Sequence, residues 1–141
     1  MMKPFKYLFL LVIVLATTIA SCKKQEGNMS RAKLLTSKPW RFLSSKTNGV
    51  ADHIEDCEKD DFVIFAFISD YTWSPGGKKC DSQETIDTGT WTLSRDEKKI
   101  TLKSYVSTKE VIATIVELTE SILVFSFEET GYVWEKTYIA L

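Results

Sequence analysis

Residues 57–93 constrain the fold of this chain more than any other stretch. Two cysteines, Cys57 and Cys80, enclose the apolar run FVIFAFI (62–68) and the triplet YTW (71–73). Apolar segments this short, separated by polar turn residues, are typical of antiparallel strands rather than of helices. The stretch therefore predicts a β-hairpin whose open end carries one cysteine on either side.

The two cysteines are expected to form a structural disulfide bond. Ser69 and Asp70 are the predicted hairpin turn, and this register places Cys57 and Cys80 nearly opposite each other. The N-terminal signal described below directs the chain to an oxidising compartment, where a disulfide is the default state of paired cysteines. A redox-active pair is the alternative, but no C-x-x-C spacing supports it.

The rest of the chain continues as short strands separated by charged or polar turns. Strands spaced by about 8 to 12 residues, with alternating apolar positions, indicate an antiparallel barrel or sandwich. After residue 40 no segment keeps a helical period of 3.6 residues. The residues expected on the inward faces of these strands are Trp91, Leu93, Ile100, Leu102, Ile112, Val116, Leu118, Leu123, Phe125 and Phe127.

Residues 1–21 have the features of a lipoprotein signal peptide. Lys3 and Lys6 precede an uncharged, mostly apolar run of 14 residues. A bilayer-spanning helix needs about 20 such residues, so the run has the length of a signal-peptide core instead. It ends in Ile-Ala-Ser-Cys (19–22), which resembles the bacterial lipobox, so cleavage before Cys22 and its acylation are expected. An ordinary secretory signal with a chance cysteine after it is the alternative.

The chain thus divides into a signal peptide (1–21), a flexible tether (22–29) and one domain (30–141) large enough to bury a single core. Several acyl chains on Cys22 give stable anchoring, so the membrane is an expected partner. We expect an exported protein anchored to the cell envelope, at the outer membrane, because no aspartate follows Cys22 as an inner-membrane retention signal.

A short helix and a tryptophan are expected at the start of the domain. Residues 30–37 have room for one or two helical turns, with Ser30 as the N-cap and Leu34 and Leu35 as the buried edge. Pro39 ends this helix because the residue before a proline is displaced from the helical region.

The order of these features resembles the small lipocalin-like domain lipoproteins of Bacteroidetes envelopes. The features are the lipobox, the short helix, Trp40 on the first strand, the segment CEKDDF (57–62), the segment KKCD (78–81) and the segment TGTWTL (88–93). The resemblance covers about residues 34–141. It implies an all-β, antiparallel, eight-stranded lipocalin-like up-and-down barrel with a short N-terminal helix, and Trp40 across its closed end.

The resemblance also implies a barrel that can hold an apolar ligand, although a fold alone names no ligand. An eight-stranded barrel is wide enough either to be filled by its own side chains or to hold one small molecule. The large number of aromatic residues favours filling. Where a cavity exists, its expected ligand-binding lining is Trp40, Phe65, Trp91, Phe125 and Trp134.

We expect no enzymatic activity, no catalytic residue, no metal site and no cofactor. His53, the single histidine, has no second histidine or thiolate at ligand spacing and no recognisable nucleophile motif. It lies in an acidic cluster, residues 52–61, that lacks the glycine and the final glutamate of an EF-hand loop. This cluster is predicted to be a solvated loop.

Charge and fold together favour a binding module as the function. Without the signal peptide the chain has 16 basic and 19 acidic residues, a net charge of −3, so nucleic acid is not an expected partner. The leading hypothesis is a lipid-anchored module that binds a small apolar or amphipathic ligand in the barrel mouth. The alternative is an envelope structural or protein-interaction module with a filled core, acting on a protein partner through its rim loops. An enzyme is the least supported class.

Overall fold

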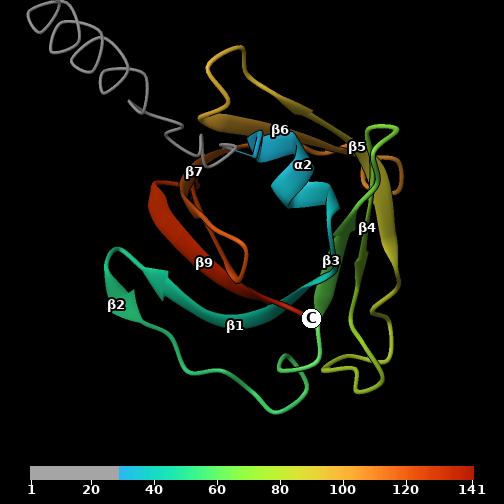
Figure 1. Cartoon of the computed structure of the whole chain (residues 1–141). Coiled ribbons are helices and arrows are strands. Elements are labelled where there is room, and N and C mark those ends of the chain that lie inside the picture. Colours follow the sequence, from blue (N-terminus) through green and yellow to red (C-terminus); the bar gives the residue numbers. More distant parts are fainter. Residues whose placement is uncertain (1–28) are drawn as a thin grey trace, which may run out of the picture.

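The computed structural model describes residues 29–141, which form one antiparallel sheet that closes on itself (Figure 1). In this part of the chain, no helix is both long enough and apolar enough to cross a membrane. The predicted signal peptide, Cys22 and most of the predicted tether lie outside the described residues. In chain order, the elements are α2 (Arg31–Thr36), β1 (Trp40–Thr47), β2 (Val50–Ala51), β3 (Phe62–Phe65), β4 (Asp70–Ser74), β5 (Asp87–Leu93), β6 (Lys99–Ser104), β7 (Glu110–Leu118), β8 (Ile122–Glu129) and β9 (Tyr132–Ala140).

The sheet becomes a barrel because its first long strand pairs with its last. The strand order is β2-β1-β3-β4-β5-β6-β7-β8-β9, and β1 also pairs with β9. This second pairing runs from Trp40 opposite Ala140 to Thr47 opposite Trp134. Strands β1 and β3 to β9 therefore form a closed eight-stranded barrel, and the two-residue β2 only extends the end of β1. The predicted all-β antiparallel barrel with a short N-terminal helix is confirmed.

The helix α2 closes one end of the barrel (Figure 1). The Ser30 hydroxyl accepts a hydrogen bond from the Lys33 amide (3.3 Å), as expected of an N-cap. Leu35 and Trp40 are fully buried, and the Trp40 indole donates to the Leu35 carbonyl (2.9 Å). The tryptophan thus lies under the helix and satisfies its own polar atom there.

Because neighbouring strands are antiparallel, the connections between them alternate between the two ends of the barrel. We call the end that carries α2 the closed end, and it also holds the turns at residues 66–69, 94–98 and 119–121. We call the opposite end the open end, and it holds residues 48–61, 75–86, 105–109 and 130–131.

Aromatic rings fill the middle of the barrel. The ring of Phe65 lies edge-to-face against Trp91, with centroids 5.8 Å apart, and against Phe125 at 6.2 Å. Phe125 in turn contacts Tyr138 at 6.0 Å, and Tyr138 contacts Phe42 at 5.7 Å. Each such pair contributes roughly 0.5–1.5 kcal/mol beyond its buried area. Smaller side chains, including Leu35, Val63, Ile100, Ala113, Ile115 and Leu123, complete the buried core.

The β3–β4 hairpin has a different register from the one predicted. Phe65 pairs with Tyr71, so the turn consists of residues 66–69, and Asp70 is the first residue of β4 rather than a turn residue. The Ala66 amide donates to the Asp70 carbonyl (2.7 Å), which closes the longer turn. The apolar run at 62–68 is therefore only partly strand.

The longer turn is held by a residue from the next strand. The Trp91 indole donates to the Ala66 carbonyl (3.0 Å), and the Trp91 amide donates to the Ser69 carbonyl (2.8 Å). Between these two anchored carbonyls, Phe67 and Ile68 are displaced from the barrel wall and are 85% and 76% exposed.

The predicted inward face of β7 is wrong at two positions. Ile112 and Val116 are 56% and 54% exposed, whereas Ala113 and Ile115 are buried. Ala113 pairs with Ile100 of β6, and the register of β7 against β8 shifts after Ile115, which makes Val116 an extra residue. The pairing of Ala113 with buried Ile100 sets the inner face of β7 and leaves Ile112 and Val116 on the outer face, whereas the bulge affects only the residues that follow it, such as partly buried Leu118.

Candidate functional site

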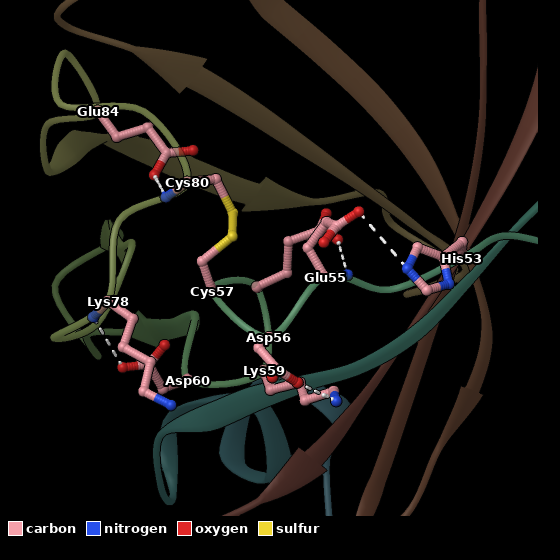
Figure 2. The surroundings of a disulfide bond; sticks show 10 residues. His53, Glu55, Asp56, Cys57, Lys59, Asp60, Lys78, Cys80 and Glu84 are labelled. Carbon is pink, nitrogen blue, oxygen red and sulfur yellow. Dashed lines mark hydrogen bonds and ion pairs between the residues drawn. A yellow bond between two sulfur atoms is a disulfide. The ribbon is translucent and has the colours of Figure 1, made fainter.

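A disulfide bond organises the loops at the open end (Figure 2). Cys57 and Cys80 are bonded across a sequence separation of 23 residues, with their Cα atoms 5.2 Å apart. The bond joins the loop of residues 52–61 to the loop of residues 75–86. The disulfide predicted from the sequence is confirmed.

Asp60 provides a second link between the same two loops. Its carboxylate accepts hydrogen bonds from the backbone amides of Gly77 (2.8 Å) and Lys78 (3.1 Å). These amides stabilise the ionised form, and the Gly77 bond does most to hold the pKa of Asp60 below its usual value. Gly76 turns here with φ +64°, and a Cβ on it would lie 2.5 Å from the Asp60 carbonyl oxygen.

The acidic cluster at 52–61 is more ordered than a simple solvated loop. Beside the disulfide, Asp56 forms an ion pair with Lys59, and Glu55 donates its amide to Glu58 (2.8 Å). His53 is exposed on the surface, with its Nε2 3.5 Å from Glu55 Oε1 (Figure 2). Among residues 29–141, no group of three histidine, cysteine or acidic side chains is placed to hold a metal ion.

The open half of the barrel contains an inward-facing lysine. In the β8–β9 pairing, Lys136 is opposite Phe125, and Tyr138 is opposite Leu123. Residues directly opposite each other in an antiparallel pair share a face, so Lys136 lies on the same inner face as buried Phe125. Its ammonium lies 5.8 Å from the centroid of the Phe42 ring, a cation–π distance. No ion pair of Lys136 occurs within residues 29–141.

Lys136 lines a small cavity that opens between the disulfide-linked loops and the aromatic core. The cavity measures about 80 Å³. Aromatic side chains and charged groups share its wall, which consists of Phe42, Glu58, Asp61, Trp73, Lys136 and Tyr138. We refer to it as the mouth cavity.

Two groups in the wall of the mouth cavity, the Asp61 carboxyl and the Tyr138 hydroxyl, have raised pKa values. Partial burial raises the pKa of Asp61 to about 6, the nearby carboxylates of Glu84, Asp60 and Glu58 add to this effect, and Lys136 opposes it. Burial likewise raises the pKa of the Tyr138 hydroxyl, and the charge of Asp61 adds to the shift. The cavity wall therefore combines the Lys136 ammonium with the carboxyl groups of Glu58 and Asp61, and the pKa of Asp61 lies close to neutral pH.

A second polar cluster lies on strands β4, β5 and β6 and forms its own hydrogen bonds. Asp87 accepts from the Tyr71 hydroxyl (3.0 Å) and from the Ser104 hydroxyl (2.6 Å). Burial, followed by the interaction with Asp87, raises the pKa of Tyr71 to about 12. Gly89 permits this arrangement, because a Cβ there would lie 1.9 Å from the Lys103 carbonyl oxygen and 2.7 Å from the Tyr71 ring.

The five residues predicted to line a cavity lie elsewhere in the barrel. Trp40, Phe65, Trp91 and Phe125 are buried, and the ring of Phe65 contacts both Trp91 and Phe125. Trp134 on β9 is partly exposed, and its indole nitrogen is enclosed without a hydrogen-bond partner in the described part of the chain. None of the five lines the mouth cavity.

Sequence reasoning missed the residues that do line the mouth cavity. Lys136 lies two residues after Trp134 and two before Tyr138 in a strand of period two, so its alternation with two aromatic residues was a usable signal. No sequence signal distinguished Asp61 from the other acids of its loop, because its pKa depends on burial by strands that are distant in sequence.

Comparison with known proteins agrees with this architecture. A search of the curated proteins finds no match. The family model of the lipocalin-like domain matches residues 37–125, which include β1 to β7 and the first half of β8. This range is more than half of the chain, which therefore belongs to the lipocalin-like domain family.

Proposed function

We propose that this protein is a lipid-anchored envelope lipoprotein that binds a small amphipathic ligand at the open end of its barrel. The observation that carries the proposal is the position of Lys136 inside the mouth cavity. A pocket in which a few polar groups lie among aromatic side chains is typical of a small-molecule site, and the Lys136 ammonium beside the Phe42 ring offers a charge partner to an anionic group. The lipocalin-like domain family is generally non-catalytic, which also favours binding.

The shape of the interior indicates how the ligand is bound. The closed half is filled by core side chains, so a long apolar chain does not extend to α2. A volume of about 80 Å³ suits a polar group of a few atoms. We therefore place an anionic group against Lys136, with the adjoining apolar part of the ligand against Trp73 and Phe42 at the rim.

Membrane attachment is the second component of the proposal. It is supported by the lipobox at residues 19–22 and by the acylation that this motif implies at Cys22. The disulfide between Cys57 and Cys80 supports an exported location, because such bonds persist in oxidising compartments. The outer membrane is the proposed site because no aspartate follows Cys22.

The alternative function is an envelope interaction module. The filled closed half of the barrel favours it, together with the exposed acidic residues of the 52–61 loop. In this alternative the mouth cavity holds only water and the partner is a protein.

Ligand binding is tested with Lys136→Met, which removes the charge and keeps the length of the side chain. Mature protein is titrated with decanoate and with decanol, each below its critical micelle concentration, and the melting temperature is measured. We expect decanoate to raise the melting temperature of the wild type and to have little effect on Lys136→Met. Lys103→Met is the matched control, because Lys103 pairs with exposed Glu110 on the barrel exterior, and it should respond like the wild type.

Native purification followed by solvent extraction and mass spectrometry identifies any molecule that stays bound. A stoichiometric amphiphile would support the binding function. An empty extract, together with equal responses of wild type and Lys136→Met to decanoate, would exclude the mouth cavity as the site. Crosslinking through the 52–61 loop would then test the interaction module.

A further inference from the structure

We propose that the closed end of the barrel docks on an anionic lipid surface through Phe67 and Ile68, which we call the apolar tip. This inference goes beyond the ligand site at the open end. It rests on the proposed acylation of Cys22 for delivery to the membrane.

The apolar tip is an unusual feature for a turn. Phe67 and Ile68 are consecutive and are 85% and 76% exposed, although full burial of such side chains is worth about 1.5–3 kcal/mol each. The backbone on both sides of them is fixed by the hydrogen bonds of Trp91 to Ala66 and Ser69. The tip is therefore held away from the barrel core by the fold itself.

The apolar tip shares one face of the molecule with α2 and with the β5–β6 turn. Phe67 forms a wall of a shallow groove of about 490 Å³, together with Ala32 and Thr36 of α2 and with Arg95 of that turn. The Arg31 guanidinium donates to the Glu97 carbonyl (3.2 Å), which ties the helix to the same turn. An approaching flat surface would meet these three elements together.

The charges of the two ends differ in sign and favour this orientation on an anionic bilayer. The closed-end segments, residues 29–39, 66–69, 94–98 and 119–121, carry five basic and three acidic side chains, a net charge of +2. The open-end segments carry four basic and eight acidic side chains, a net charge of −4. The exposed apolar residues of the open-end segments, Val50, Ile86, Tyr105 and Val106, therefore lie among net negative charge, which anionic lipid repels.

The length of the intervening chain brings the closed end to the membrane. Ser30, the N-cap of α2, is eight residues after Cys22 in the sequence. Even fully extended, eight residues span at most about 28 Å. An acylated Cys22 thus keeps the start of α2 near the headgroups, and docking of the apolar tip directs the mouth cavity away from the bilayer.

Docking is tested with one environment-sensitive label at either end of the barrel. Ile68→Cys places the label on the apolar tip, and Val106→Cys, at a residue 64% exposed, is the matched control at the open end. The three native cysteines are Cys22, Cys57 and Cys80, so acylation and the disulfide leave the added thiol as the reactive one. Full-length acylated protein is reconstituted on vesicles of phosphatidylethanolamine and phosphatidylglycerol that contain a nitroxide-labelled lipid.

The expected result is a blue-shifted, quenched label at residue 68 and an unchanged label at residue 106. The shift should decrease on vesicles of phosphatidylcholine alone. Co-sedimentation of the protein with a water-exposed label at residue 68 would overturn docking and leave the anchor intact. A protein that stays in the supernatant would overturn both docking and anchoring, and a blue shift without vesicles would show that a second copy covers the tip.

Discussion

Asp61 is a residue whose partly buried environment makes the stability of the folded chain depend on pH. Its folded pKa of about 6 exceeds its ordinary value of 3.8, so the native state holds this proton more tightly than the unfolded chain does. Stability from this group is therefore present below about pH 4 and is lost as the pH rises toward 6. Because the carboxyl remains partly exposed, solvent screening reduces the effect to about 1 kcal/mol.

Asp61→Asn should remove the free-energy cost of ionising this partly buried carboxyl group. We expect the variant to be more stable than the wild type by about 1 kcal/mol at pH 7 and to differ little from it at pH 4. Urea denaturation at the two pH values measures the difference. Glu128→Gln, at an exposed carboxyl on β8, is the control and should leave the pH dependence unchanged. Equal stability of wild type and Asp61→Asn at pH 7 would show that the Asp61 charge is fully solvated.

At the level of single elements, the sequence predicted strands better than it predicted their faces. Strand β8 has apolar residues mainly on one face, and its predicted inward residues Leu123 and Phe125 are buried. Strand β7 has apolar residues on both faces, so its pattern did not determine which face is buried. Its bulge arises from pairing with β8, which local sequence does not reveal.

The β7 register predicts losses of stability of very different size for two isoleucines in one strand. Ile115→Ala should cost about 3 kcal/mol because it leaves a cavity in the core. Ile112→Ala should cost less than about 0.5 kcal/mol, since this side chain is 56% exposed. Chemical denaturation of the two variants compares them directly. A larger loss for Ile112→Ala would reverse the assignment of the β7 faces.

The β3–β4 hairpin illustrates the same limit for turns. The sequence correctly predicted the strands and the disulfide, but it placed the turn at Ser69 and Asp70. The four-residue turn is stabilised by Trp91, and no pattern within residues 62–74 reports a hydrogen bond from another strand.

The disulfide should stabilise the chain mainly by restricting the unfolded state. In the chain-entropy model, a loop closed across 23 residues contributes about 3 kcal/mol. The double variant Cys57→Ser, Cys80→Ser should lose this amount and keep the barrel, because both residues lie in loops at the open end. Urea denaturation measures the loss of stability, and circular dichroism shows whether the barrel is kept. The reduced wild type should match the double variant, and a loss below about 0.5 kcal/mol would contradict the entropic account.

At the scale of the whole molecule, the mouth cavity could not be predicted from the sequence. It is formed by side chains from β1, β4, β9 and the 52–61 loop, and only barrel closure brings these together. Four of the five aromatic residues predicted to line a cavity are buried inside the barrel, but they pack as core side chains and do not line the mouth cavity. Trp40 lies under α2, and Phe65, Trp91 and Phe125 fill the middle of the barrel, whereas charged side chains share the wall of the cavity toward the open end.

Closure of the barrel depends on β9, which lies beyond the residues that match the family model. Removal of residues 132–141 would expose the facing edges of β1 and β8 and would take Tyr138 from the core. Unpaired strand edges promote association between chains. We therefore expect the truncated chain to lose its cooperative thermal transition and to elute as aggregate in size-exclusion chromatography.

A shorter deletion shows whether the loss of folding comes from the open barrel or from any truncation at the C-terminus. Leu141 is 62% exposed, and its amide donates one hydrogen bond to the Pro39 carbonyl (3.0 Å). Deletion of Leu141 alone should therefore cost about 1 kcal/mol and leave a folded monomer. A folded, monomeric chain without residues 132–141 would mean that seven strands bury enough core to be stable alone. Because β9 carries Lys136, such a chain would also lack the cation of the mouth cavity, so folding and ligand binding depend on the same last strand.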